Sequence, residues 1–295
     1  MTLLPKDKEG CPFLILAPME GVGDGCFRKA IASIGGFDLA VRDFLRVPKC
    51  AHVSSIAQQY EFAELGEIPL AAQLMGSDTE LMAEMAQEIE KRGAPRIDIN
   101  CGCPSNTVTG RGAGSSLLKE PSVLHEVAKS VVSSVSIPVS LKMRSGYDDT
   151  SLFKENLLAA QESGISYLTL HPRTKVEGYG PPANWDLIAE AKSYLRIPIV
   201  GNGDILSVKD AQEMLKKTQC DALMIGRGAI INPFLFHQIR ASFRKESYLP
   251  SWSKMELFFH VYHQELRVDS PEKTKIGKLK QLMGFLFKAT SFLLE

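Results

Sequence analysis

The chain has 295 residues, of which 44% are hydrophobic and 23% charged, and its 34 basic residues balance its 34 acidic ones. This composition excludes a disordered, collagen-like or low-complexity chain, and the length suffices for one barrel-sized domain with an appendage. A net charge of zero argues neither for nor against a polyanionic partner. The charge is uneven, however, because residues 241–295 carry nine basic and six acidic residues. The tail is therefore +3 and the remainder −3.

The six cysteines are too few for the disulfide framework of a small secreted protein, and the N-terminus turns charged before an apolar signal core develops. No run of about 18 uncharged apolar residues occurs, so a membrane span is not expected. These features predict a cytoplasmic protein. The Cys101-x-Cys103 pair lacks the partners that a zinc or iron–sulfur site needs, and no metal is predicted.

Short apolar runs bounded by glycine or proline recur along the chain and predict eight strands. They lie at 13–16, 37–41, 69–74, 96–99, 138–143, 167–170, 197–200 and 222–225. Segments with helical spacing separate them, such as 79–91 and 207–217, with Ser207 as the N-cap of the latter. Eight such units predict a closed α/β (β/α)8 TIM barrel with parallel strands. An open doubly wound sheet is the alternative.

Two more helices are predicted beyond the point where the barrel closes, at 252–268 and 271–294. Ser253 and Glu256 have the spacing of a capping box for the first of them. Ser270 before Pro271 has the pattern of an N-cap followed by proline at the first helical position.

The stretch around Arg244 and Pro250 forms a boundary between these helices and the barrel. We therefore expect a catalytic barrel over residues 1–243 and a small C-terminal α-helical domain over residues 250–295.

The active site of a (β/α)8 barrel lies at the carboxyl ends of its strands, so the polar residues at these ends are the candidates. They are Glu20, Gln73, Asn100, Cys103, Lys142, Arg144, His171 and Arg173. The last two strands are followed by Gly201-Asn202-Gly203-Asp204 and Gly226-Arg227-Gly228. Glycine lets the backbone N–H groups approach a phosphate closely at this position of the barrel, so these loops predict a phosphate site.

Lys142, Gln73 and His171 differ in how specifically each indicates a ligand. Lys142 lies in an otherwise apolar strand, where an unpaired charge is costly, and predicts an anionic or electron-rich ligand. Gln73 has both donors and acceptors for the edge of a heterocyclic ring. His171, taken by itself, is equally consistent with a core histidine whose hydrogen bonds are satisfied.

Cys103 stands at the start of a long loop, 105–116, that contains three glycines. A long loop at the catalytic face is a candidate lid. A thiol with a pKa of about 8.5 is mostly protonated at neutral pH and can act as a proton donor as well as a nucleophile. Cys101, two residues earlier, is predicted to be structural.

These motifs, in this order, resemble the tRNA-dihydrouridine synthases over residues 11–240, and more loosely afterwards. The resemblance rests on Ala17-Pro18-Met19-Glu20-Gly21-Val22, Gln73-Leu74-Met75-Gly76, Asp98-Ile99-Asn100-Cys101-Gly102-Cys103-Pro104-Ser105, Lys142-Met143-Arg144-Ser145-Gly146, His171-Pro172-Arg173-Thr174, Gly201-Asn202-Gly203-Asp204-Ile205 and Gly226-Arg227-Gly228. Within the family, the first and third of these motifs are most similar to the bacterial class that modifies uridine 16.

The resemblance implies an FMN cofactor across the barrel mouth, with NADPH as reductant. It places Pro18, Met19, Glu20 and Gln73 at the isoalloxazine ring, Lys142 at the N1/O2 edge of that ring, and His171 beside the flavin. The ribityl phosphate is expected at Asn202, Gly203, Asp204, Gly226 and Arg227. In the implied reaction, the reduced flavin passes a hydride to C6 of a uridine and Cys103 protonates C5.

The implied substrate is a uridine of the tRNA D-loop, which must be flipped out to reach the barrel mouth. Asn100, Arg144 and Arg173 are the residues expected to hold it. The C-terminal helical domain of the family is usually longer than these two helices, so the resemblance implies that the tail is short or truncated. The basic tail is expected to contact the tRNA backbone. The members of the tail proposed for this contact are Lys273, Lys275, Lys278 and Lys280.

Two alternatives remain open on the sequence. The first is an FMN-dependent barrel oxidoreductase that acts on a free small molecule such as a dihydropyrimidine, since the cofactor loops would look alike. The basic helical tail and the Cys103 loop speak against it. The second is a binding protein that keeps the fold without turnover, and the presence of Cys103, Lys142 and Asn100 argues against that.

Overall fold

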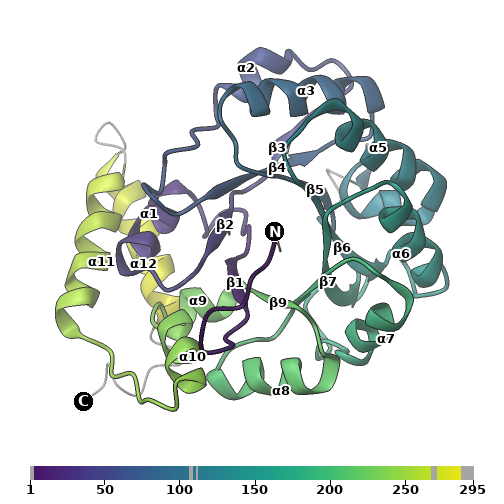
Figure 1. The fold of residues 1–295 in the computed structure, drawn as a ribbon. Helices are drawn as coiled ribbons and strands as arrows, with labels where there is room; N and C mark the ends of the chain where they lie inside the picture. The colour runs from purple at the N-terminus through teal and green to yellow at the C-terminus, as the bar shows by residue number, and fades with distance from the viewer. Residues whose placement is uncertain (1–2, 106–108, 111, 267–270, 287–295) are drawn as a thin grey trace.

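Eight parallel strands close into a ring, which Figure 1 shows along its axis. The computed structural model describes residues 3–105, 109–110, 112–266 and 271–286. The strands follow the order β2-β1-β9-β8-β7-β6-β5-β4, and the ring closes because β2 also pairs with β4. The predicted (β/α)8 barrel is confirmed, and this closing pair excludes an open sheet.

All eight predicted strands form, with some shifted ends. They are β1 (Phe13–Leu16), β2 (Leu39–Val41), β4 (Leu70–Met75), β5 (Ile97–Cys101), β6 (Val139–Gly146), β7 (Tyr167–Thr174), β8 (Ile199–Asn202) and β9 (Ala222–Ile225). A short extra strand that the sequence did not indicate, β3 (Leu45–Arg46), pairs with the far end of β4.

Helices surround the ring on its outside (Figure 1). They are α1 (Gly25–Ile34), α2 (Val53–Ala57), α3 (Thr79–Lys91), α5 (Pro121–Ser134), α6 (Phe153–Glu162), α7 (Asp186–Tyr194), α8 (Val208–Thr218), α9 (Arg227–Ile231) and α10 (Leu235–Phe243), with a 3-10 helix η1 (Gly114–Lys119). The predicted cap of α8 is confirmed, because the Ser207 hydroxyl accepts from Asp210 N at 3.2 Å.

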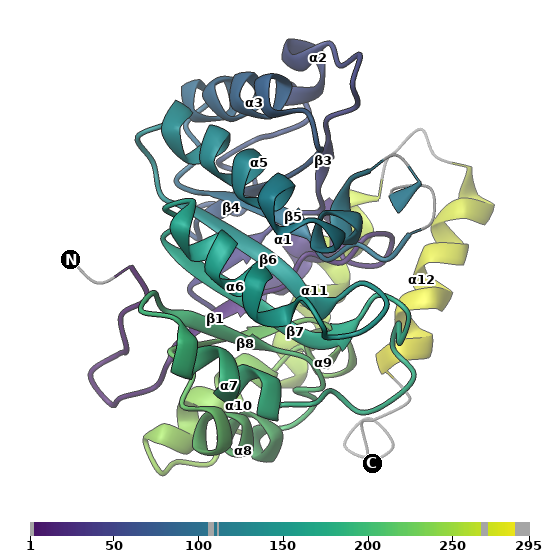
Figure 2. The ribbon, with the colours of Figure 1, turned by 90° about the vertical axis from the view of Figure 1, so that its right-hand side faces the viewer.

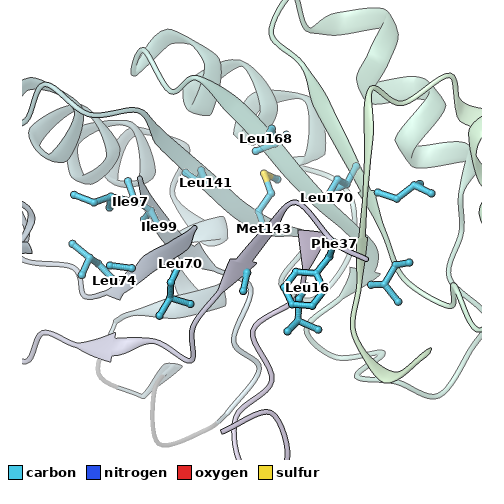
Figure 3. Packing of buried hydrophobic residues seen from close by; sticks show 14 of the residues in the cluster. Leu16, Phe37, Leu70, Leu74, Ile97, Ile99, Leu141, Met143, Leu168 and Leu170 are labelled. Carbon is cyan, nitrogen blue, oxygen red and sulfur yellow. The ribbon is translucent and has the colours of Figure 1, made fainter. Parts of the chain in front are cut away.

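Side chains alternate along each strand between the helix layer and the barrel interior, as a period of two requires. The positions that face the helices are apolar and form the main core. Figure 3 shows Leu141 and Met143 of β6 together with Leu168 and Leu170 of β7 in this layer. Cys101 packs in the same layer, which supports its predicted structural role.

The barrel interior, by contrast, has an apolar half and a polar half. β1, β2, β8 and β9 fill it with side chains such as Ile15, Leu39 and Met224. The interior positions of β4 to β7 include Gln73, Asp98, Asn100, Ser140, Lys142, Thr169 and His171. Bulky branched apolar residues dominate the interior of most such barrels. The polar half of the interior therefore departs from this pattern and lies on β4 to β7.

Two strands run farther than their apolar runs predict. β6 continues to Gly146 and β7 to Thr174, because their pairing continues through Arg144 opposite His171. His171 and Arg173 consequently lie inside β7 and not in the loop after it. Hydrophobicity alone predicts the end of β7 too early, because most residues at the carboxyl end of this strand are polar.

The two C-terminal helices, α11 (Trp252–Glu265) and α12 (Glu272–Leu286), lie beside α1 and α9 (Figure 1). The predicted capping box of α11 is wrong. The helix begins one residue before Ser253, which places Ser251 at the cap position, and the two hydroxyls contact each other at 2.7 Å. The predicted N-cap Ser270 and the residues after 286 lie outside the described residues.

Two ion pairs attach these helices to α1. Lys29 Nζ lies 2.7 Å from Glu265 Oε2, and Lys278 Nζ lies 2.5 Å from Asp24 Oδ2, the carboxylate that also caps α1. The rings of Phe27 and Phe258 meet edge to face at 6.1 Å between the same elements. None of the helices in the described part of the chain is long and apolar enough to cross a membrane.

Candidate active site

A cavity of about 510 Å³ opens at the carboxyl ends of the strands, a volume within the range of small-molecule sites. Its wall contains many of the residues that the sequence singled out. They are Pro18, Met19, Glu20, Gln73, Asn100, Cys103, Lys142, Arg144, His171 and Arg227. The strand order thus gathers residues that lie up to 209 positions apart in the sequence.

A second hollow of about 90 Å³ adjoins this cavity, and the two share Lys142 and His171 in their walls. The remaining predicted cofactor residues line it, namely Asn202, Gly203, Asp204 and Gly226. The structure therefore brings the predicted ring site and the predicted phosphate site next to each other. Arg173 lines neither hollow.

The smaller hollow is built around glycines that a side chain would disturb. A Cβ atom on Gly228 would lie 2.1 Å from the carbonyl oxygen of Ile205, and Gly203 has a φ of +110°. α9 begins at Arg227, directly after Gly226. The two strand-end loops thus approach each other closely and line the hollow together with Arg227, Asp204 and Lys142.

Lys142 brings a positive charge to the place where the two hollows meet. Burial, and secondly the neighbouring Arg144, lowers the pKa of its ammonium to about 8. Within the described residues no hydrogen bond or ion pair holds this ammonium. It is therefore available to an anionic ligand, as the sequence predicts.

Arg144, predicted to hold substrate, is 2% exposed and mainly braces the wall. Its Nε donates to the carbonyl of Gly102 at 2.9 Å, and its Nη1 donates to those of Thr174 and Gly178. The guanidinium also lies 5.3 Å from the ring centre of Tyr179. These contacts tie the loop that carries Cys103 to the loop after β7.

Arg173 lies behind the wall and not in it, because it pairs with Asp204. Its Nη2 lies 2.5 Å from Asp204 Oδ2, and Arg227 approaches the other carboxylate oxygen at 2.8 Å. These hydrogen bonds and charges hold the pKa of Asp204 below its usual range, although burial opposes them. The structure therefore does not bring Arg173 to the wall of either hollow.

Cys103 is 9% exposed and lines the larger cavity. Its backbone N–H donates to Asn100 Oδ1 at 2.9 Å, which fixes the main chain at the end of β5. Burial raises the pKa of the thiol, so the group keeps its proton at neutral pH. Part of the predicted lid loop, residues 106–108 and 111, lies outside the described residues.

The sequence did not single out five further residues of the cavity wall, Asp43, Phe44, Tyr179, Ile230 and Phe285. Tyr179 follows β7, lines both hollows, and lies between Arg144 and Arg227, with its ring centre 4.9 Å from the Arg227 guanidinium. Phe285 belongs to α12, which stands at the end of the barrel where β6 and β7 finish (Figure 2). An aromatic residue in a loop or in an appended helix carries no signal of its own, because only the fold places it at the mouth.

The four lysines proposed for nucleic-acid contact separate into two kinds. Lys278 pairs with Asp24 and Lys275 with Glu272. Lys273 and Lys280 are exposed on α12. The described part of the chain holds no group of three or more side chains that could ligate a metal ion.

A family model described as dihydrouridine synthase matches residues 15–288. The chain belongs to the dihydrouridine synthase family. The predicted resemblance is confirmed, and the protein is an enzyme of the oxidoreductase class. Family membership thus agrees with a site that combines a buried thiol, an ammonium and two adjoining hollows.

Relatives with names agree with this membership. The tRNA-dihydrouridine(16) synthase of Neisseria meningitidis serogroup B is 36% identical over 288 residues, which cover 93% of this chain and 86% of that protein. The tRNA-dihydrouridine(16) synthase of Pseudomonas syringae pv. tomato is 35% identical over 285 residues, which cover 94% and 90%.

Solved structures of more distant proteins share the barrel. A 2-naphthoyl-CoA reductase complex gives a TM-score of 0.59 at 11% identity and covers 80% of this chain and 50% of its own. Histamine dehydrogenase from Rhizobium sp. 4-9 gives 0.58 at 12% identity and covers 79% and 46%. At this identity the likeness shows the fold alone.

Proposed function

We propose that this protein is an FMN- and NADPH-dependent tRNA-dihydrouridine synthase that reduces uridine 16 of the D-loop, with Cys103 as the general acid. One observation carries the proposal: a protonated thiol and the ammonium of Lys142, which is unpaired among the described residues, line the same cavity in a member of this family. The position in the tRNA follows the names of the two relatives.

The residues present fit FMN. The glycine-lined hollow offers backbone and Arg227 to a phosphate, and the larger cavity is of a size that takes a flat ring system. Lys142, which has no protein partner in the described residues, supplies a positive charge that would stabilise an electron-rich ring edge. When bound, FMN would supply the hydride equivalent taken from NADPH.

The protein's own groups would complete the reaction. Cys103 donates its Sγ proton to C5 of the uracil, and the raised pKa of the thiol keeps that proton available at neutral pH. Asn100 lines the cavity beside it and can donate an N–H to a uracil carbonyl. Phe285 and Tyr179 add aromatic surface to the wall of the same cavity.

We assign tRNA contact to residues 250–295, with residues 1–243 as the catalytic barrel. The exposed Lys273 and Lys280 lie on the same helix as Phe285, so a strand of RNA that enters the cavity passes close to them. We also assign the protein to the cytoplasm. All six cysteines are free thiols, as is usual in a reducing compartment.

The test is a map of dihydrouridine in unmodified tRNA incubated with the purified protein, FMN and NADPH. We expect dihydrouridine at position 16, and we expect Cys103→Ala to retain flavin and NADPH oxidation while losing dihydrouridine. Full tRNA activity in Cys103→Ala would refute the acid assignment. A yellow protein that oxidises NADPH and leaves tRNA unchanged would point to a free small-molecule substrate.

A further inference from the structure

Two carboxamides of the cavity wall belong to a continuous chain of hydrogen bonds that begins at a buried carboxylate. Gln73 Nε2 donates to Asp98 Oδ2 at 2.6 Å, and Asn100 Nδ2 donates to Gln73 Oε1 at 2.8 Å. Asn100 Oδ1 then accepts from the backbone N–H groups of Gly102 at 3.0 Å and Cys103 at 2.9 Å. The chain of bonds connects the interior of the barrel with the loop that carries the thiol.

The groups at the two ends of this series of hydrogen bonds determine which atoms donate and which accept. The backbone N–H groups of Gly102 and Cys103 can only donate, so the oxygen of Asn100 faces them and its nitrogen faces Gln73. At the other end a carboxylate can only accept, so the nitrogen of Gln73 faces Asp98. The two requirements agree, and neither carboxamide can rotate by 180° without losing a buried hydrogen bond.

Asp98 is 1% exposed and lines neither hollow. Its second oxygen accepts from Ser140 Oγ at 2.6 Å. Burial raises the pKa of this carboxyl, while the bonds from Gln73 and Ser140 and the charge of Lys142 act in the opposite direction. A buried acid is costly in the interior of a barrel. A residue of this kind, without access to ligand, acts through its neighbours.

We propose that Asp98 is a positioning residue that holds the main chain of Cys103 at the cavity wall through Gln73 and Asn100. Each carboxamide keeps one N–H hydrogen that the chain of bonds does not use. The wall therefore offers donors to the carbonyl oxygens of a bound ring. The inference rests on the proposed function only in treating Cys103 as the acid, and its test does not depend on turnover.

The experiment measures the alkylation rate of Cys103 by iodoacetamide in the purified protein, resolved by peptide mass spectrometry. The exposed Cys50 of the same molecule is the internal reference. In Asp98→Ala, Gln73 loses its acceptor, and we expect Cys103 to react about tenfold faster relative to Cys50, as for one lost buried hydrogen bond. Ser140→Ala, which leaves the Gln73 bond intact, is the matched control.

Asp98→Asn is expected to restore the parent ratio to within about twofold. Its side-chain oxygen can accept from Gln73 while its nitrogen donates to the hydroxyl of Ser140. Such rescue separates the hydrogen-bond role from a need for charge. An Asp98→Ala ratio equal to that of the parent protein, or an equal rise in Asp98→Asn, would overturn the proposal.

If Asp98→Ala fails to fold, Gln73→Leu takes its place. This variant interrupts the same series of hydrogen bonds at its next member and must show the same rise in the alkylation rate of Cys103 relative to Cys50. The proposal is then wrong if Gln73→Leu leaves the ratio unchanged. Failure here and failure of the proposed function are distinguishable. Loss of dihydrouridine formation in Cys103→Ala, together with an unchanged ratio in Asp98→Ala, would retain the acid and reject the positioning role.

Discussion

The Nη1 atom of Arg173 lies 3.2 Å from Nε2 of His171, and this contact sets the tautomer of the imidazole. A guanidinium only donates, so Nε2 accepts and the ring hydrogen is on Nδ1. Burial, followed by the charges of Lys142, Arg144 and other cations, lowers the pKa of His171 to about 2. His171 is thus a neutral N–H donor in the wall of both hollows.

Nitrogen-15 NMR of the imidazoles is expected to find His171 neutral, with its hydrogen on Nδ1, at every pH between about 5 and 8. His171→Asn identifies the signal. Because an unfolded histidine takes up a proton below about pH 6.5, this residue destabilises the fold as the pH drops below that value. The parent protein should lose about 2 kcal/mol of unfolding free energy through His171 between neutral pH and pH 5, and urea unfolding should show that His171→Asn does not. Titration of the His171 signal near pH 6.5 would contradict the assignment.

Replacing Lys142 by methionine should weaken flavin binding and strengthen the fold. The variant removes a buried, unpaired charge, so we expect the free energy of unfolding of the flavin-free protein at pH 7 to rise by about 1–3 kcal/mol. Thermal unfolding and flavin titration measure the two effects. Lys129→Met, on the exposed face of α5, is the control for loss of a lysine.

The same lysine predicts a pH dependence. Its ammonium is charged below a pKa of about 8 and neutral above it, so affinity for an anionic ligand should fall as the pH rises through that value. The fall should be absent in Lys142→Met. A parent protein whose flavin affinity stays constant from pH 7 to about 9 would show that the ammonium does not contact the anion.

Arg227→Ala should reduce flavin retention about tenfold, because a charge-assisted hydrogen bond to a phosphate is lost. Asp204 keeps its second partner, Arg173, in this variant, so the loop after β8 is expected to hold its shape. Equilibrium dialysis against FMN measures the change. Lys209→Ala removes an exposed positive charge from α8 and should retain flavin as the parent does.

The same substitution at two lysines of α12 should affect two different properties, the hydrogen-exchange protection of the helix for Lys278 and tRNA binding for Lys280. Lys278→Gln breaks the ion pair with Asp24 and should reduce the protection of α12 in hydrogen exchange, by no more than about 1 kcal/mol for a partly exposed pair. Lys280→Gln should leave protection unchanged and weaken tRNA binding, with a smaller salt dependence. Equal effects of both variants on protection and on tRNA binding would reject this division.

The sequence predicts the barrel well because its strands are buried on both faces and therefore read as apolar runs. It also predicts the strand-end motifs, since glycine pairs and a lysine within a strand are local signals. The brief strand β3 has no such signal. The placement of Arg173 behind Asp204 depends on the pairing of β7 with β8, which no local pattern encodes. Phe285 reaches the cavity only through the packing of α12 on the barrel.

The division of the barrel interior has a further meaning for how this chain can change. The seam where the barrel closes joins its first and last strands, with Phe13 opposite Ala222, and is apolar. The polar interior positions come from β4 to β7, whereas the loops that complete the two hollows follow β1, β8 and β9. The first and last strands therefore have to keep the ring shut and also present loops of the smaller hollow, so substitutions there are constrained by both requirements.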